Sequence, residues 1–222
     1  MRSRTTIPFD LLNDKVNSIF KLSGKILITA GILMAAACSG PGEQDTWTLN
    51  CDTDASESCA YVDANGTTMI DCEKYLICFS DTFDNYAIVG TQDEGIVAIN
   101  RQEEILYQVF VYDNGPDYPS DGYFRILQDG KMGYADAPTG AIRIKPQYSA
   151  AKPFENQYAP VCPNCDLIEE KDHYYWTNGQ WGLIDKNGTM VVEPQYDDII
   201  EISNTGEALV ILQGEEKRIK IE

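Results

Sequence analysis

Short apolar runs, separated by turn-forming residues, follow one another along the chain from residue 86 onwards. The runs are rich in β-branched and aromatic residues, and no useful stretch after residue 40 has the 3.6-residue apolar period of a helix. Runs of this kind, bounded by Gly, Asn, Asp or Pro, are typical of β-strands. The pattern predicts an all-β fold with strands at Tyr86–Val89, Ile96–Ile99, Ile105–Tyr112, Tyr123–Leu127, Gly133–Asp136, Ile142–Ile144, His173–Trp176, Gly182–Asp185, Met190–Val192, Ala208–Leu212 and Arg218–Ile221.

The plan of runs and turns repeats. Residues 178–198 contain two turn signals, two apolar runs and a Pro-Gln-Tyr exit, and residues 129–148 follow the same order. The copies match at an offset of 49 before the middle turn and 48 after it, because that turn is one residue longer upstream. Length variation confined to a turn indicates a structural repeat, since turns tolerate insertions better than strands do.

Fainter copies have the same order of runs. Residues 86–110 lack the Pro-Gln-Tyr, residues 60–70 repeat the pattern weakly, and residues 208–221 look like a shortened copy. Each unit is expected to carry three strands, which is too little surface to bury a core alone, so neighbouring units must stack. We therefore expect tandem three-stranded β-repeat units in a curved, solenoid-like array, with a closed, propeller-like array as the alternative.

The better copies resemble the WG repeat found in many bacterial proteins. The resemblance rests on Gln180-Trp181-Gly182, Asn187-Gly188 and Glu193-Pro194-Gln195-Tyr196. It is strong over residues 179–199, moderate over 123–154, weak over 86–110 and absent before about residue 80. The family is read as β-strand repeats of mostly unassigned biochemical role, so it implies an architecture and little chemistry. The signature positions are Met132 (in place of Trp), Gly133, Pro146, Tyr148, Trp181, Gly182, Pro194 and Tyr196.

These signature residues have packing roles in our interpretation. Trp181 is expected to fill the space between units, and Gly182 to allow a close approach of backbones. Pro194 is expected to follow a strand and end its ladder, and Tyr148 and Tyr196 to pack at equivalent corners. Asn-Gly pairs are typical of tight hairpins, and three are predicted to be such turns: Asn65-Gly66, Asn178-Gly179 and Asn187-Gly188.

The start of the chain has the pattern of an export signal. Two lysines precede an apolar run of 12 residues, Ile26–Ala37, whereas a membrane-spanning helix needs about 20. A basic flank, a short apolar core and small residues before a cleavage point are typical of a secretory signal. Ala35-Ala36-Ala37-Cys38 also resembles the lipobox of bacterial lipoproteins, in which the cysteine is lipidated and becomes the first mature residue. The alternatives are a plain signal peptide or a buried helix.

The 222-residue chain therefore divides into four parts. Residues 1–37 are the leader, residues 38–45 the lipidated cysteine with its tether, residues 46–84 a Cys-rich degenerate cap, and residues 85–222 the β-repeat domain. By resemblance to lipoproteins, Ser39 after the cysteine implies the outer membrane. We expect an exported cell-envelope protein, held at the membrane by its lipid.

The chain is strongly acidic, and removal of the leader would make its net charge still more negative. The leader holds five of the 17 basic and two of the 35 acidic residues, which leaves 12 and 33, a net charge of −21. Nucleic acids and anionic lipids are disfavoured as partners, because both require a positive footprint. The balance favours solubility and cationic ligands.

Six cysteines follow Cys38, and export favours disulfides among them. Four fall within residues 51–78, where local bridges are expected. Cys162-Pro-Asn-Cys165 has the spacing of a thioredoxin-like redox motif, but its flanks suggest a loop between repeats, and acidic neighbours raise a thiol pKa. A structural disulfide is expected there, with a zinc site or a redox centre as alternatives. The disulfide candidates are Cys51, Cys59, Cys72, Cys78, Cys162 and Cys165.

Catalytic signatures are absent from the sequence. The only histidine, His173, lies on a predicted strand, and no nucleophile elbow, zinc-protease motif or phosphate-binding loop is present. Residues 52–57 alternate oxygen-bearing side chains as calcium loops do, but lack the central Gly and closing Glu of an EF-hand. Residues 113–122 suggest an extended loop between units, and such loops often carry function. The candidate binding patch consists of Tyr112, Tyr118 and Tyr123.

We therefore predict a non-enzymatic, lipid-anchored repeat protein without a cofactor, which presents a binding surface for a protein or a glycan in the cell envelope. The alternative is an envelope redox or zinc protein that uses Cys162 and Cys165.

Overall fold

The computed structural model describes residues 45–51, 58–170 and 173–221. The predicted leader, the lipidation site Cys38 and the calcium-like segment 52–57 lie outside the described residues. The described part consists of antiparallel strands and one short 3₁₀ helix, η1 (Cys72–Lys74), which confirms the all-β prediction. Within this part no helix has the length and apolar character needed to cross a bilayer. The solenoid-like or propeller-like arrangement stays a prediction.

The Cys-rich segment forms a four-stranded sheet of order β3-β2-β1-β5. In this sheet the side chains of Tyr61 and Phe83 are fully buried and pack edge to face. They share one core with Val89 and Val97 of the next sheet, so this segment does not pack alone. The strands are β1 (Trp47–Cys51), β2 (Cys59–Val62), β3 (Thr68–Asp71) and β5 (Thr82–Phe83).

A seven-stranded sheet follows, of order β13-β12-β11-β8-β7-β6-β4. A separate two-stranded ribbon, β9 (Val111–Tyr112) and β10 (Gly115–Pro116), interrupts it between β8 and β11. The sheet comprises β4 (Ile77–Cys78), β6 (Ala87–Thr91), β7 (Gly95–Ile99), β8 (Ile105–Val109), β11 (Tyr123–Gln128), β12 (Lys131–Asp136) and β13 (Ile142–Tyr148).

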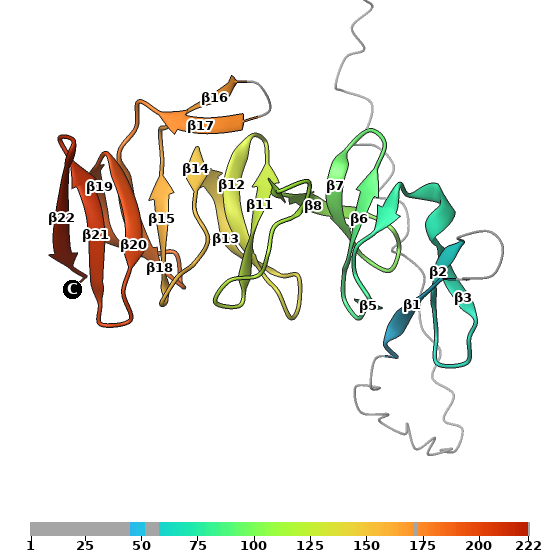
Figure 1. Cartoon of the computed structure of the whole chain (residues 1–222). Helices are drawn as coiled ribbons and strands as arrows, with labels where there is room; N and C mark the ends of the chain where they lie inside the picture. The colour runs from blue at the N-terminus through green and yellow to red at the C-terminus, as the bar shows by residue number, and fades with distance from the viewer. Residues whose placement is uncertain (1–44, 52–57, 171–172, 222) are drawn as a thin grey trace, which may run out of the picture. The chain divides into compact units, whose positions relative to one another are not determined.

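The rest of the described chain forms three smaller sheets (Figure 1). A four-stranded sheet has the order β14-β15-β18-β19, a hairpin pairs β16 with β17, and a three-stranded sheet has the order β20-β21-β22. Every strand predicted from the sequence overlaps an observed one. The strands are β14 (Ala150–Ala151), β15 (Tyr158–Cys162), β16 (Asp166–Glu170), β17 (His173–Thr177), β18 (Trp181–Asp185), β19 (Met190–Tyr196), β20 (Asp198–Ile202), β21 (Glu207–Leu212) and β22 (Glu215–Lys220).

The two best copies share one bulge. In the second copy Trp181 faces Tyr196 and Leu183 faces Val192, so two residues of β18 span four residues of β19. In the first copy β12 and β13 show the same shift, from Met132 facing Tyr148 to Tyr134 facing Ile144. The extra residues are the ones around the proline of Pro-Gln-Tyr, and the bulge therefore accounts for the spacing of the motif.

The glycine of each copy faces this bulge. A Cβ on Gly182 would lie 2.4 Å from the Val192 oxygen and 2.9 Å from the Pro194 nitrogen, and Gly133 meets its own bulge in the same way. The expectation that Pro194 ends the ladder is wrong, because Pro194 lies inside β19. A bulged edge strand accepts proline, since the absent N–H leaves no ladder bond broken.

A five-residue turn recurs between paired strands. At β18–β19 the Asp185 carboxylate accepts hydrogen bonds from the N–H groups of Asn187 (2.9 Å) and Thr189 (2.8 Å), and Gly188 has a φ of 80°. Partial desolvation opposes these bonds, but together they hold the pKa of Asp185 below its ordinary value. Asp63 forms the same turn between β2 and β3, as the Asn65-Gly66 pair predicted.

Two further copies of this turn escaped the sequence analysis. Asn100 accepts from the N–H groups of Gln102 (3.0 Å) and Glu104 (2.9 Å), and the Ser203 hydroxyl accepts from the Glu207 N–H (3.1 Å). The fourth residue again has a positive φ, with Glu103 at 64°. The turn needs one acceptor oxygen and one left-handed residue, so its residue types change while its geometry does not.

The large repeat offset comes from an inserted hairpin. Tyr123 and Tyr158 open equivalent strands, each behind a two-residue turn closed by a β-bridge, and they lie 35 residues apart. A two-residue turn joins β11 to β12, whereas the β16–β17 hairpin lies between β15 and β18 and raises the offset to 49. The loop predicted around the Cys162–Cys165 motif is therefore wrong, because its flanks are the strands β15 and β16.

The insertion and the strands β14 and β20 extend the predicted three-strand unit. β14 precedes β15 and pairs with it, and β20 precedes β21 and pairs with it in the same way. The Asn178-Gly179 pair is not a hairpin turn, since β17 and β18 on either side belong to different sheets.

Substitution of Gly182 by alanine tests the bulge. The added Cβ meets backbone atoms that lie in a paired strand, so Gly182→Ala should lower the free energy of unfolding by about 1–3 kcal/mol in equilibrium urea unfolding. Gly115→Ala is the matched control, because its Cβ meets no atom closer than 3.9 Å. Equal stability of the two variants would contradict the close approach.

Candidate binding surface

Two of the three predicted tyrosines lie together on the surface. The rings of Tyr112 and Tyr118 have centroids 6.0 Å apart at an interplanar angle of 77°, and the side chains are 53% and 64% exposed. Tyr123 lies elsewhere, with its ring packed edge-on against buried Phe154 at 5.1 Å. The structure therefore assembles a tyrosine pair and leaves Tyr123 in the packing of the repeat.

The tyrosine pair sits on the small ribbon formed by β9 and β10. Tyr112 faces Gly115 and Val111 faces Pro116, and two left-handed residues, Asp113 (φ 48°) and Asn114 (φ 64°), turn the chain between them. Mirror-image turns of this kind suit the twist of a two-residue hairpin, and Asp and Asn tolerate them better than most residues. The loop predicted for residues 113–122 is thus partly an ordered hairpin.

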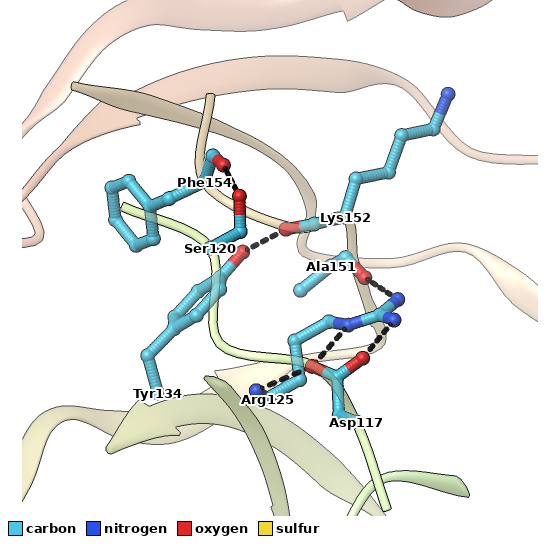
Figure 2. A network of polar contacts seen from close by, with 7 residues as sticks. All are labelled: Asp117, Ser120, Arg125, Tyr134, Ala151, Lys152 and Phe154. Atoms are coloured by element: carbon cyan, nitrogen blue, oxygen red, sulfur yellow. Dashed lines mark hydrogen bonds and ion pairs between the residues drawn. The ribbon is translucent and has the colours of Figure 1, made fainter. Parts of the chain in front are cut away.

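A buried ion pair fixes this ribbon to the sheet (Figure 2). Asp117 and Arg125 are both 5% exposed. The Asp117 carboxylate accepts bonds from the Arg125 Nε (2.9 Å), Nη2 (2.5 Å) and backbone N (2.8 Å). Two parallel hydrogen bonds between a guanidinium and a carboxylate fix the orientation of both side chains. The cost of removing two charges from water limits how much the pair adds to the stability of the fold. Its main effect is to select one conformation of the loop.

The same arginine connects the loop to the next repeat. Its Nη1 donates to the Ala151 carbonyl at 3.3 Å, and beside it the Tyr134 hydroxyl donates to the Lys152 carbonyl at 2.7 Å (Figure 2). Burial raises the pKa of Tyr134, which keeps its hydroxyl a donor. Ser120 at the end of the loop donates to the Phe154 carbonyl at 2.5 Å. The ribbon is therefore held from two sides.

Rings and cations continue from the tyrosine pair into the core. The Arg125 guanidinium lies 4.2 Å from the Phe110 ring centre and 6.0 Å from that of Tyr112. Phe110 contacts Trp176 of β17 with centroids 6.2 Å apart, and Trp176 contacts Trp181 at 6.5 Å. The Lys152 ammonium lies 5.0 Å from the Trp181 ring centre. We call this set the aromatic ladder: Tyr118, Tyr112, Arg125, Phe110, Trp176, Trp181 and Lys152.

The ladder ends beside the disulfide Cys162–Cys165. Both cysteines are buried in one cluster with Trp181, and a Cβ on Gly179 would lie 2.4 Å from either sulfur atom. The bridge spans the short connection between the end of β15 and the start of β16, where the inserted hairpin begins. Within the Cys-rich segment, bridges join Cys51 to Cys59 and Cys72 to Cys78.

The signature residues are mostly interior. Met132, Tyr148, Trp181 and Tyr196 are buried, and each tryptophan-position residue faces the tyrosine of its own repeat across the bulge. His173 begins β17. Among the described residues, no group of three or more His, Cys, Asp or Glu side chains is placed to hold a metal ion.

A pocket of about 430 Å³ lies beside this network, lined by residues 152–155, Pro160 and residues 199–202, with Ser120 at its edge. Its lining combines apolar side chains with Lys152, Glu155 and Glu201. Lys152 donates to the Asp198 carboxylate (2.6 Å) and the Ile199 carbonyl (2.8 Å), so its ammonium is already bound within the protein.

The sequence analysis missed Arg125 and Asp117. Arginine in the apolar run Tyr123-Phe-Arg-Ile-Leu127 was the available signal, because a charged side chain between buried neighbours needs a partner. The partner could not be named from the sequence, since Asp117 was one of several carboxylates in its loop.

Comparison with known proteins supports the repeat. A family model described as WG containing repeat matches residues 132–164 and 181–210. The two matches begin at Met132 and Trp181, the equivalent positions of the two copies. No curated protein matches the chain.

Removal of the Asp117 carboxylate tests the ion pair. Asp117→Ala leaves the Arg125 charge buried and unpaired, and should lower the free energy of unfolding by about 3–5 kcal/mol. The double variant Asp117→Leu/Arg125→Met removes both charges and should recover most of that loss in urea unfolding.

Asp198→Ala is the control, since this partner of Lys152 is 43% exposed and its ion pair should contribute at most about 1 kcal/mol. Equal losses for the Asp117 and Asp198 variants would contradict the role given to the buried pair.

Proposed function

We propose, from the match of residues 132–164 and 181–210 to the model described as WG containing repeat, that this chain is a non-enzymatic binding module of the cell envelope. Its β-repeats form a scaffold, and the tyrosine pair Tyr112 and Tyr118 is the contact surface for a protein or glycan partner. The observation that carries this proposal is an exposed aromatic pair mounted on a buried, bidentate ion pair.

The physical argument for this contact surface is that the two tyrosine rings are held in place before a partner binds. An exposed aromatic pair on a mobile loop loses binding energy to ordering, whereas a fixed pair does not. The Asp117–Arg125 pair, the β9–β10 ribbon and the Ser120 bond to Phe154 all restrict the segment that carries the two rings. Tyrosine also suits a contact surface, because its large rigid side chain has an apolar face and a polar tip.

The proposed location follows from the sequence. We propose that cleavage before Cys38 and lipidation of this cysteine hold the protein at the outer membrane, with the acidic repeats in the aqueous phase. Three disulfides fit an oxidising compartment outside the cytoplasm.

The alternative, a redox or zinc protein based on Cys162 and Cys165, gains no specific support. Cys162 is fully buried and Cys165 is 7% exposed, and both pack against Trp181. Reactive thiols are usually partly exposed in a positive environment. A structural bridge at the base of the inserted hairpin is the better interpretation.

Mass spectrometry of the protein purified from bacterial membranes tests the location and the bridges together. Intact and peptide masses, with and without reduction, should show a chain that starts at lipidated Cys38 with Cys162 and Cys165 bridged. An unlipidated chain would remove the anchor, and free or zinc-loaded thiols would revive the alternative.

The contact surface is tested by the double variant Tyr112→Ser/Tyr118→Ser. The immobilised protein should retain specific components of an envelope extract or of a glycan panel, and the variant should lose them while its urea unfolding stays near wild type, since both side chains are exposed. Ile200→Ser, at another exposed apolar position, is the matched control. Unchanged retention by the tyrosine variant would refute the binding surface.

A further inference from the structure

The aromatic ladder ends at the exposed ring of Tyr118. Arg125 lies over Phe110 and Tyr112, Lys152 lies over Trp181, and Trp176 is placed between two other rings. Tyr118, at the exposed end, contacts Tyr112, and the described part of the chain supplies no cation to it. We propose that this end binds an arginine side chain from a basic, extended segment of a partner protein. This inference rests on the proposed binding function and names its partner class.

The chain already contains the contact that we propose. Arg125 lies 4.2 Å from the centre of the Phe110 ring while Asp117 accepts two bonds from its guanidinium. A planar guanidinium can stack on a ring and bind a carboxylate at the same time, which an ammonium does less well. Tyr118 and Tyr112 offer the same ring chemistry at the surface, and exposed Asp113, next to Tyr112, offers the carboxylate.

Several of the protein's own cations already lie against aromatic rings. Of the 12 basic residues after the leader, five lie over aromatic rings of the chain itself: Lys74, Arg101, Arg125, Lys152 and Lys186. Cation–ring contacts are thus a repeated device of this fold. The exposed ring of Tyr118 could therefore accept a cation from a partner protein in the same kind of cation–ring contact.

Net charge selects between candidate occupants. Residues 38–222 carry a net charge of −21, which attracts basic segments and repels a second copy of the chain. A neutral glycan could stack on the tyrosines but would gain nothing from the acidic field. Charge complementarity therefore favours a basic protein segment, whose association should weaken as salt screens the field.

A labelled ten-residue peptide of alternating Arg and Gly is the probe, titrated into the full-length protein in detergent and followed by fluorescence anisotropy. Tyr118→Leu should weaken binding about 2- to 5-fold, the value of one exposed cation–ring contact. Tyr118→Phe should bind as wild type, because the ring remains. Asp113→Asn and replacement of Arg by Lys in the peptide should each weaken binding further.

Tyr175→Leu, which removes a half-exposed ring from the inserted hairpin, is the matched control and should leave the affinity unchanged. Equal affinity of wild type and Tyr118→Leu, or an affinity that is insensitive to salt, would overturn the inference. If the double tyrosine variant loses its envelope or glycan ligand while peptide binding ignores Tyr118, the partner class is wrong and the binding surface stands. If neither assay depends on the tyrosines, both proposals fail.

Discussion

Close contact between one glycine and a proline-containing bulge determines the shape of each well-preserved repeat. The bulge lets two residues of the central strand span four of its neighbour, which brings Trp181 opposite Tyr196 and Met132 opposite Tyr148. A side chain at Gly182 would collide with the backbone of that neighbour, so the glycine, the proline and the buried ring depend on each other. The sequence signature of the repeat therefore reflects one packing geometry.

The candidate binding surface depends on a buried polar contact, the Asp117–Arg125 ion pair. Asp117 lies in the loop after β10 and Arg125 on β11. Well-packed uncharged side chains could replace such a pair at little cost in stability. Their pairing instead gives the loop a single arrangement, with two exposed rings in fixed positions. Arg125 contributes twice, since its edge binds the carboxylate while its face covers Phe110. One residue, Arg125, thus both orders the loop that carries the tyrosine pair and packs against an aromatic side chain.

The sequence predicted the strands because their residue types and turns act locally. Short apolar runs and turn residues were enough for β7, β12 and β18, and Asn65-Gly66 and Asn187-Gly188 marked real turns. The prediction failed where contacts between residues distant in the chain determine the local structure. The flanks of the cysteine motif suggested a loop between repeats, yet β15 pairs with β14 and β18. The Asn178-Gly179 pair suggested a hairpin turn, but Gly179 instead lies where a Cβ would collide with the sulfur atoms of Cys162 and Cys165.

The candidate site divides in the same way. Tyr112 and Tyr118 could be chosen because one precedes a turn-rich loop and the other lies within it, and the structure brings them together. Tyr123 was grouped with them by proximity in the chain, but strand β11 directs it to Phe154. Arg125 and Asp117 form a pair across the fold, and no local pattern records such a partnership.

The inserted hairpin shows how such an array can gain new parts. In one repeat two residues connect the first strand to the second, and in the next a complete β-hairpin occupies the same connection. The pairing of Asp166 with Thr177 brings the ends of the hairpin together, and β15 and β18 on either side of it pair with each other. This connection is therefore a natural grafting point, at which a foreign loop can be exchanged for residues 166–177 while the scaffold is left as it is.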